Sequence, residues 1–226
     1  DYGHTLNDIG LGTFHDGGNQ VQPKTYFIAR GLISPDKKEL YDITQFLATE
    51  GNGGIIKNNT SPEALLQAVR NPQKKPLHPI YLFFTADMTG KFGAISKVGS
   101  WNIVNGGSQQ RVYQNLACNN ITNEEMNCRG AKIDLKAGKI NKQMALRRMV
   151  FIRDGQVLRE QEFKHSQGHT LQLIVVGRQI VEVQLIDEAV FLSNYNQMFL
   201  LGRYRKDLFE ETYNAFPFSR LYQIKF

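Results

Sequence analysis

A change in the spacing of apolar residues near Trp101 constrains the fold of this chain more than any other feature. Before it, "SPDKKELYDITQFLATEG" and "TSPEALLQAVRN" carry helical spacing, and each opens with a Ser-Pro pair, Ser34-Pro35 and Ser61-Pro62. Serine is a preferred N-cap and proline a preferred first helical residue, so each pair predicts a helix start. After Trp101, segments such as "RRMVFIRDGQVLREQEF" and "HTLQLIVVGRQIVEVQLID" alternate apolar and polar residues, which is typical of strands. The "RDGQ" stretch at residues 153–156 predicts a tight hairpin turn.

Helical patterns return after this β-rich block. We expect residues 189–216, "AVFLSNYNQMFLLGRYRKDLFEETYNAF", to be helical and "RLYQIKF" to be a closing strand. We also expect an apolar strand over residues 80–84, followed by a helix that begins with "DMTGKFGAI". Helices on both sides of a β block predict an α+β fold: a mainly helical central core, residues 1–101 and 180–226, with an antiparallel, β-rich and barrel-like unit, residues 102–179, inserted into it.

Composition sets broad limits on function. With 226 residues, of which 41% are hydrophobic, the chain is long enough to bury a core. The net charge of +6 is spread over scattered cations, which favours ordinary solvated faces over a site for nucleic acid or anionic lipid. No run approaches the roughly 20 apolar residues of a membrane span. The sequence starts at Asp1 rather than Met, so we expect a fragment of a longer protein.

The two cysteines, Cys118 and Cys128, lie ten residues apart in the polar stretch "ACNNITNEEMNC". A disulfide closing so short a loop is worth ~3 kcal/mol in the chain-entropy model. We predict this disulfide and therefore an extracytoplasmic location; the alternative is two unpaired cytosolic thiols. A metal site is not expected, because the pair has no accompanying His and because "HSQGH", with His165 and His169, contains a glycine and lies between predicted strands.

Three residues of "DMTGKFGAI" form an unusual stripe. Met88, Lys91 and Ile95 stand at positions i, i+3 and i+7, which a helix brings onto one face. A lysine in the middle of this face is unusual for a core. Gly90 and Gly93 keep one side of the helix thin, at a cost of ~1 kcal/mol each relative to Ala. The stripe either packs with its lysine reaching solvent, or presents a surface to a ligand.

At three places the chain resembles the catalytic subunits of oligosaccharyltransferases. Asp1-Tyr2-Gly3, with "DGGN" some residues later, looks like the end of their WWDYG signature. Bacterial, PglB-type members carry Met-x-x-Ile-x-x-x-(Ile/Val/Trp), and archaeal and eukaryotic members carry Asp-x-x-Lys-x-x-x-(Met/Ile). Met88, Lys91 and Ile95 fit a mixture of the two patterns. The segment "FLSNYNQMFLLGRYRKDLFE" is similar to the C-terminal helical segment of the PglB type.

The resemblance implies the soluble, periplasmic C-terminal domain of a multi-pass membrane glycosyltransferase. The whole enzyme transfers an oligosaccharide from a lipid pyrophosphate carrier, undecaprenyl in the bacterial type, to Asn in Asn-x-Ser/Thr. Its divalent metal, Mn or Mg, and its lipid-linked oligosaccharide site belong to the membrane region. This chain is therefore expected to bind no metal or nucleic acid, to carry no catalytic residue, to be inactive alone and to be monomeric.

The resemblance also implies an acceptor-peptide site made by Asp1, Tyr2, Gly3, Met88, Lys91 and Ile95. Asp1 would accept a hydrogen bond from the Ser/Thr hydroxyl, and the helix stripe would contact the Thr methyl, worth ~0.8 kcal/mol. Lys91 stands where PglB relatives have isoleucine, so its apolar stem would lie along the methyl while its ammonium pairs with Asp1 or Asp87. Such a pair would hold the carboxylate ionised.

Two functions of other classes are compatible with the same residues. One is a non-catalytic periplasmic module that binds glycan or protein through the β insertion. Hydrophobic helices and Trp-Trp upstream of Asp1 would favour the enzyme, and a soluble upstream region would favour the module. The other is an RNA-binding α+β protein, whose affinity would fall steeply with salt.

Overall fold

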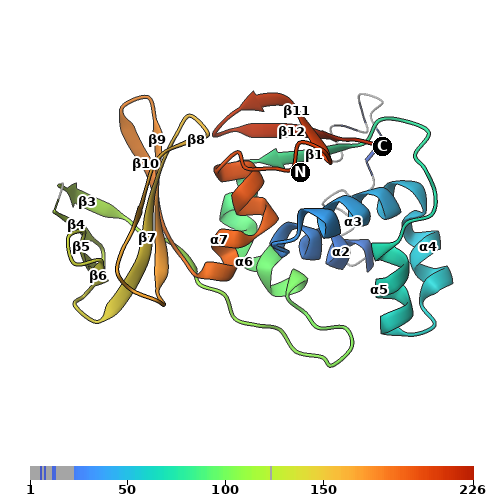
Figure 1. Ribbon diagram of the computed structural model, residues 1–226, viewed down its shortest axis with the longest axis horizontal. Helices are drawn as coiled ribbons and strands as arrows, with labels where there is room; N and C mark the ends of the chain where they lie inside the picture. The colour runs from blue at the N-terminus through green and yellow to red at the C-terminus, as the bar shows by residue number, and fades with distance from the viewer. Residues whose placement is uncertain (1–5, 7, 9–11, 14–22, 123) are drawn as a thin grey trace.

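The structure is a computed structural model that describes residues 6, 8, 12, 13, 23–122 and 124–226, and all structural statements below concern these residues (Figure 1). The helices are α2 (Pro23–Ile33), α3 (Lys37–Thr49), α4 (Gly51–Asn58), α5 (Pro62–Arg70), α6 (Asp87–Gly99), α7 (Glu188–Leu192) and the π-helix η2 (Tyr195–Leu200). The strands are β1 (Tyr81–Thr85), β2 (Tyr113–Asn115), β3 (Cys118–Ile121), β4 (Glu125–Cys128), β5 (Ala131–Asp134), β6 (Lys139–Ile140), β7 (Met144–Arg153), β8 (Gln156–Glu162), β9 (His169–Val176), β10 (Gln179–Ile186), β11 (Phe209–Ala215) and β12 (Ser219–Ile224).

A three-stranded sheet joins the early and late parts of the chain. Its order is β1-β12-β11, and β12 is antiparallel to both neighbours. The apolar strand predicted over residues 80–84 is β1, and the predicted closing strand is β12. Phe84, Tyr222 and Phe209, one from each strand, are buried in the main core. The two helical parts of the chain therefore share one core around a β block, and the α+β class is confirmed.

The β block is an open sheet and not a barrel. Its order is β2-β10-β9-β7-β6-β5-β4-β3, with β8 also paired to β7. The strand order ends at β2 and β3, which pair with no further strand among the described residues, so the barrel-like expectation is wrong. β7 also runs parallel to β9, where an antiparallel unit was expected. This arrangement arises because β8 folds back along β7, and the chain then returns to the start of β7 before β9 begins.

The expected boundary at residues 179/180 falls at the beginning of β10. That strand pairs along its length with β9, so the segment assigned to the helical core up to Ile186 lies in the larger sheet. Figure 1 shows this sheet beside α7 and α6, with β3 to β6 folded at its far side. The division of the chain into two separate domains stays a prediction.

The larger sheet is buried on both faces where β9 lies. Met149, Leu171 and Leu173 belong to a core with β4 to β6, whereas Val150 and Ile174 belong to the main core with α6, α7 and η2. In an alternating strand the polar residues usually face solvent. Instead, three of them are fully buried: Thr170, Gln172 and Gln184.

Hydrogen bonds between side chains compensate for burying these amides. Gln172 Nε2 donates to Gln184 Oε1 at 3.0 Å and to Asn196 Oδ1 at 2.9 Å. Gln184 Nε2 donates in turn to the Tyr113 hydroxyl at 3.1 Å. This network lies between the larger sheet and η2 and joins that helix to β2, β9 and β10.

Local capping explains where several elements begin. Ser61 is the N-cap of α5, as predicted, and accepts from the backbone N–H of Ala64 at 3.1 Å. For α3 the predicted cap, Ser34, is wrong. Asp36 is the N-cap because its carboxylate accepts from the Lys38 N–H, while Ser34 Oγ accepts from the Asp36 N–H.

The helical expectation for residues 189–216 holds only for its first half. α7 and η2 occupy that half, and Gly202, with φ 65°, follows them. The second half contains β11, because hydrogen bonds to β12 replace the helical ones that the pattern suggested. The predicted hairpin at residues 153–156 is confirmed: Asp154 and Gly155 have φ of 51° and 75° and connect β7 to β8.

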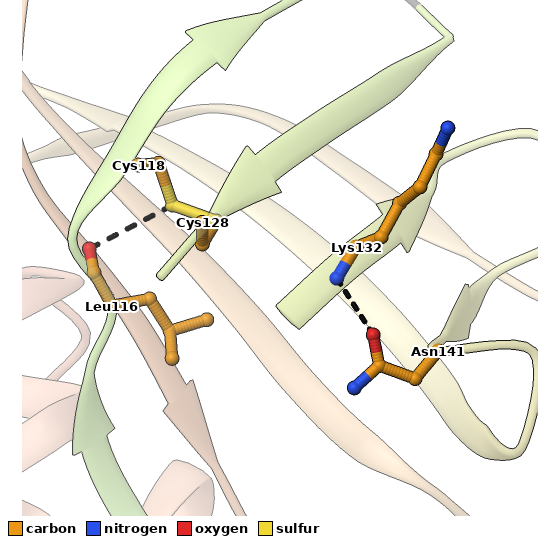
Figure 2. Close-up of a disulfide and its surroundings, with 5 residues drawn as sticks. All are labelled: Leu116, Cys118, Cys128, Lys132 and Asn141. Atoms are coloured by element: carbon orange, nitrogen blue, oxygen red, sulfur yellow. Dashed lines mark hydrogen bonds between the residues drawn. A yellow bond between two sulfur atoms is a disulfide. The ribbon is translucent and has the colours of Figure 1, made fainter. Parts of the chain in front are cut away.

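Cys118 and Cys128 are joined in a disulfide across the β3–β4 hairpin (Figure 2). They stand opposite each other where the hairpin begins and ends, so the polar stretch between them is largely paired strand. A neighbouring turn is held by Asn141, whose Oδ1 accepts from the Lys132 N–H at 2.7 Å. The disulfide thus fixes the outer part of the β block.

Candidate functional site

The helix singled out from the sequence, α6, follows β1 directly and is tied to the three-stranded sheet at its first turn. The Ala86 N–H donates to the Phe218 carbonyl at 2.9 Å, which links the start of the helix to the β11–β12 turn. Because both ends of that link lie in or beside a sheet, the position of the first turn is fixed by backbone hydrogen bonds.

The inner face of α6 packs against aromatic rings. Phe92 is fully buried and stacks on Tyr195 with ring centroids 4.5 Å apart, and Tyr113 lies 4.9 Å from Phe92. The hydroxyls of Thr89 and Tyr195 are 2.6 Å apart. Burial raises the pKa of Tyr195, so this hydroxyl stays neutral and can serve as a hydrogen-bond partner.

The last turn of α6 packs against α2 at very close range. A Cβ on Gly99 would lie 2.5 Å from the backbone carbonyl carbon and oxygen of Ala29. Only glycine permits this approach, so Gly99 sets the distance between the two helices.

The outer face of α6 carries an ion pair. Lys91 Nζ donates to Asp87 Oδ2 at 2.8 Å, and the Lys91 side chain is 65% exposed. The Thr85 hydroxyl donates to the other carboxylate oxygen, Oδ1. Partial burial pushes the pKa of Asp87 upward, but the hydrogen bonds from Lys91 and Thr85 and the charge of Lys91 outweigh it, and the pKa lies below its ordinary value.

Apolar side chains border this pair. Met88 and Ile95 are half-buried and pack against the main core, so the predicted stripe lies at the margin between core and surface. Gly90 and Gly93 are exposed, and a Cβ on either would meet no atom within 4 Å. The outer face is therefore thin and open, with the Lys91–Asp87 pair at one side.

The structure brings together three of the six predicted acceptor-site residues, Met88, Lys91 and Ile95. It also shows that Asp87 is a partner of Lys91, one of the two carboxylates considered. Asp1, Tyr2 and Gly3 lie outside the described residues, and the position of Asp1 beside Lys91 stays a prediction.

Sequence reasoning missed an apolar groove at the other end of α6. Its volume is about 650 Å³, and its walls include Tyr26, Leu65, Val98, Trp101 and Ile103. The Tyr26 hydroxyl donates to the Trp101 carbonyl at 3.0 Å, which closes one wall. These residues come from α2, α5, α6 and the loop after α6, so no pattern within one segment of the sequence predicts the groove.

The described ranges contain no group of three or more His, Cys, Asp or Glu side chains that could hold a metal ion. His165, considered with His169, has its Nε2 3.0 Å from the Ala137 carbonyl oxygen instead. Within the same ranges, no helix has the length and apolar character needed to cross a bilayer.

The fold matches that of a solved protein domain, although sequence comparison identifies no relative. No family model matches the chain, and no curated protein matches it. The crystal structure of the C. jejuni PglB C-terminal domain superposes with a TM-score of 0.73 at 17% identity, over 100% of this chain and 91% of that one. The C-terminal globular domain of the Pyrococcus abyssi oligosaccharyltransferase gives a TM-score of 0.46 at 12% identity, over 100% of this chain and 45% of that one. The chain therefore has the fold of the PglB C-terminal domain.

Proposed function

We propose that this chain is the C-terminal domain of a PglB-type oligosaccharyltransferase and that α6 helps to read the hydroxylated residue of an Asn-x-Ser/Thr acceptor. The whole enzyme would transfer an oligosaccharide from a lipid pyrophosphate carrier to the Asn. The chain by itself would bind acceptor and catalyse nothing.

One observation carries this proposal: in a chain with the PglB C-terminal fold, the family's helix motif lies at the surface. Lys91 is exposed and paired with Asp87, and Met88 and Ile95 border it. The exposed pair and the two half-buried apolar side chains beside it would offer a ligand both a charged group and an apolar surface.

The chemistry of the face suits a small hydroxylated side chain. Pairing with Asp87 holds the Lys91 ammonium at the first turn, so the methylene stem of Lys91 can lie beside Met88 and Ile95. Together these apolar groups would contact the methyl of Thr, worth ~0.8 kcal/mol or about a fourfold preference for Thr over Ser. Asp1 would accept the hydrogen bond from the hydroxyl.

The disulfide supports a location on the periplasmic side of the membrane, because such bonds persist in oxidising compartments. The divalent metal implied for the whole enzyme does not fit the described residues, since they offer no three-ligand cluster. By its resemblance to the family, the whole enzyme would bind its divalent metal and its lipid-linked donor in the membrane region.

Replacing Lys91 in the full-length protein tests the proposal. We expect Lys91→Ala to lower glycosylation of an Asn-x-Thr peptide and to reduce the Thr-over-Ser preference of about fourfold toward unity. Lys136→Ala is a matched control, because Lys136 is also exposed, at 69%, and also pairs with a carboxylate, Glu124, at 2.6 Å.

Unchanged kinetics and an unchanged Thr/Ser ratio in Lys91→Ala would refute the proposed role of α6. An equal loss in Lys136→Ala would attribute the effect to general destabilisation. Lys91→Ile, which restores the pattern of the bacterial relatives, should retain the preference for Thr.

A further inference from the structure

The apolar groove at the C-terminal end of α6 is not used by the proposed function, and it lies on the same helix as the proposed acceptor site. Val98, on the exposed side of α6, is part of its wall and is 41% exposed. Trp101, two residues after the helix ends, is 48% exposed and forms another part. A groove with aromatic and aliphatic walls binds apolar side chains best.

We propose that this groove binds a large apolar or aromatic side chain of the same acceptor polypeptide, three or four residues after its Ser/Thr. This inference rests on the proposed function of α6. It assigns the groove to the segment of substrate that follows the hydroxylated residue.

The groove and the Lys91 face are continuous along the helix. Val98 is seven residues after Lys91 and therefore lies on the same side of α6, about 10.5 Å further along the axis. Between them on this side of the helix lie Ala94, which is exposed, and Ile95, which is half-buried. An extended peptide that follows this side would cross Ala94 and Ile95 before it reaches Val98.

The distance fixes which residue of the peptide reaches the groove. An extended chain advances about 3.3 Å per residue, so about three residues cover the path from Lys91 to Val98. The direction follows from the proposed chemistry. The acceptor Asn, two residues before the Ser/Thr, must leave this domain to reach the catalytic centre, so the part that stays on α6 is the part after the Ser/Thr.

The groove is held open by hydrogen bonds that do not depend on a ligand. Tyr26 donates to the Trp101 carbonyl, and Asn102 caps the following turn by accepting from Val104 N–H and Asn105 N–H, both at 3.0 Å. Gly106 and Gly107, with φ of 71° and 82°, let the loop turn back. A preformed site lowers the entropic cost of binding.

The lining also favours an apolar residue over a neutral polar one. It includes Pro23, Phe27, Pro62 and Leu65, and its charged member is Lys97. A polar side chain placed among these residues would lose water without gaining many hydrogen bonds.

Paired acceptor peptides and two matched variants of the full-length protein test the inference. Both peptides contain Asn-x-Thr and differ only at the third residue after Thr, which is Phe or Ser. With the unmodified protein we expect the Phe peptide to have a KM about fivefold lower and a similar kcat, because the contact is made equally in the ground and transition states.

Val98→Glu should abolish the difference between the two peptides, because the carboxylate stands in the groove wall. Val104→Glu is the control: Val104 is similarly exposed, at 43%, and is not part of the wall, so the KM ratio should persist. Ser108→Trp, which fills the groove from an exposed position, should act like Val98→Glu and guards against a folding defect in that variant.

Moving the Phe from the first to the eighth residue after Thr should give the lowest KM at the third or fourth residue. A photoreactive benzoylphenylalanine at that position should label residues of the groove. A flat scan, labelling elsewhere, or equal effects of Val98→Glu and Val104→Glu would overturn the inference. So would a change in oligomeric state in Val98→Glu, which would assign the groove to a second copy of the chain.

The two proposals fail in different ways. If the Ser peptide is glycosylated in a Lys91-dependent way but the scan is flat, only the groove assignment is wrong. If no Asn-x-Thr peptide is glycosylated, or if Lys91 has no influence on transfer, the proposed function itself is wrong and the groove assignment fails with it.

Discussion

The two faces of α6 are built from different kinds of residue and respond to different demands. The inner face holds Phe92 and Gly99, which meet an aromatic ring and a backbone at close range. The outer face holds an exposed ion pair, Asp87 and Lys91, and glycines with open space around them. The contrast separates residues that maintain the fold from residues that are available to a ligand. Four substitutions can test this separation.

The largest effect is expected on the inner face. Phe92→Ala removes a fully buried ring that stacks on Tyr195 and should lower the free energy of unfolding by about 3–5 kcal/mol. Urea denaturation followed by circular dichroism measures this loss. A loss below about 1 kcal/mol would mean that α6 contributes little to the main core and that its inner face is not packed as described.

Gly99→Ala should have the next largest effect on stability. The added Cβ would lie 2.5 Å from the Ala29 backbone, so α6 and α2 must move apart, at a cost of about 1–3 kcal/mol. The same denaturation experiment applies. If Gly99→Ala were as stable as the parent, the close contact between the helices would be incorrect.

Much of this framework follows from the sequence because local signals and tertiary structure agree. Ser61 caps α5, residues 153–156 form a tight turn, and the apolar run at residues 80–84 forms β1. Local signals and the structure disagree where contacts between distant segments determine the secondary structure. Residues 209–215 have a helical pattern but form β11, because β12 offers them strand hydrogen bonds. Gln172 and Gln184 look solvent-facing but are buried, since α7 and η2 cover that face of the sheet and a hydrogen-bond network satisfies them.

The candidate site was predictable to the extent that it lies within one helix. The spacing of Met88, Lys91 and Ile95 placed them on one stripe, and Asp87 stands four residues before Lys91, a spacing that allows pairing. The second partner of Asp87, Thr85, belongs to the preceding strand. The groove joins three helices and a loop, and no periodicity within one segment reports contacts between residues as distant as Tyr26 and Trp101.

On the outer face, Gly93→Ala should change the free energy of unfolding in the opposite direction to Gly99→Ala. The added methyl meets nothing within 4 Å, so replacing glycine in a helix should stabilise the chain by about 0.5–1 kcal/mol. Acceptor KM should stay unchanged, because Gly93 is two residues from Lys91 and points away from the side that carries Lys91 and Val98. If the Gly93→Ala variant were less stable than the parent, the space around Gly93 would be smaller than described. If its acceptor KM rose, the peptide would cross α6 on the Gly93 side rather than along Lys91 and Val98.

The smallest effect is expected from the ion pair and depends on pH. Because the pKa of Asp87 is lowered in the folded chain, its stabilising contribution is present above the ordinary value of 3.8 and is lost as the pH falls through the lower, folded value. Asp87 and Lys91 are both partly exposed, so solvent screening limits the contribution to about 0.5 kcal/mol. Asp87→Asn should therefore be slightly less stable than the parent at pH 7, and the two unfolding free energies should converge in strong acid. A difference that persists below the folded pKa would mean that the loss in Asp87→Asn does not come from the charge pair with Lys91, because the carboxyl is then neutral and, like the amide, can still accept the Thr85 hydrogen bond. The outer face would then owe its geometry to a neutral contact, and Lys91 would be held less firmly than the proposed reading of Thr requires.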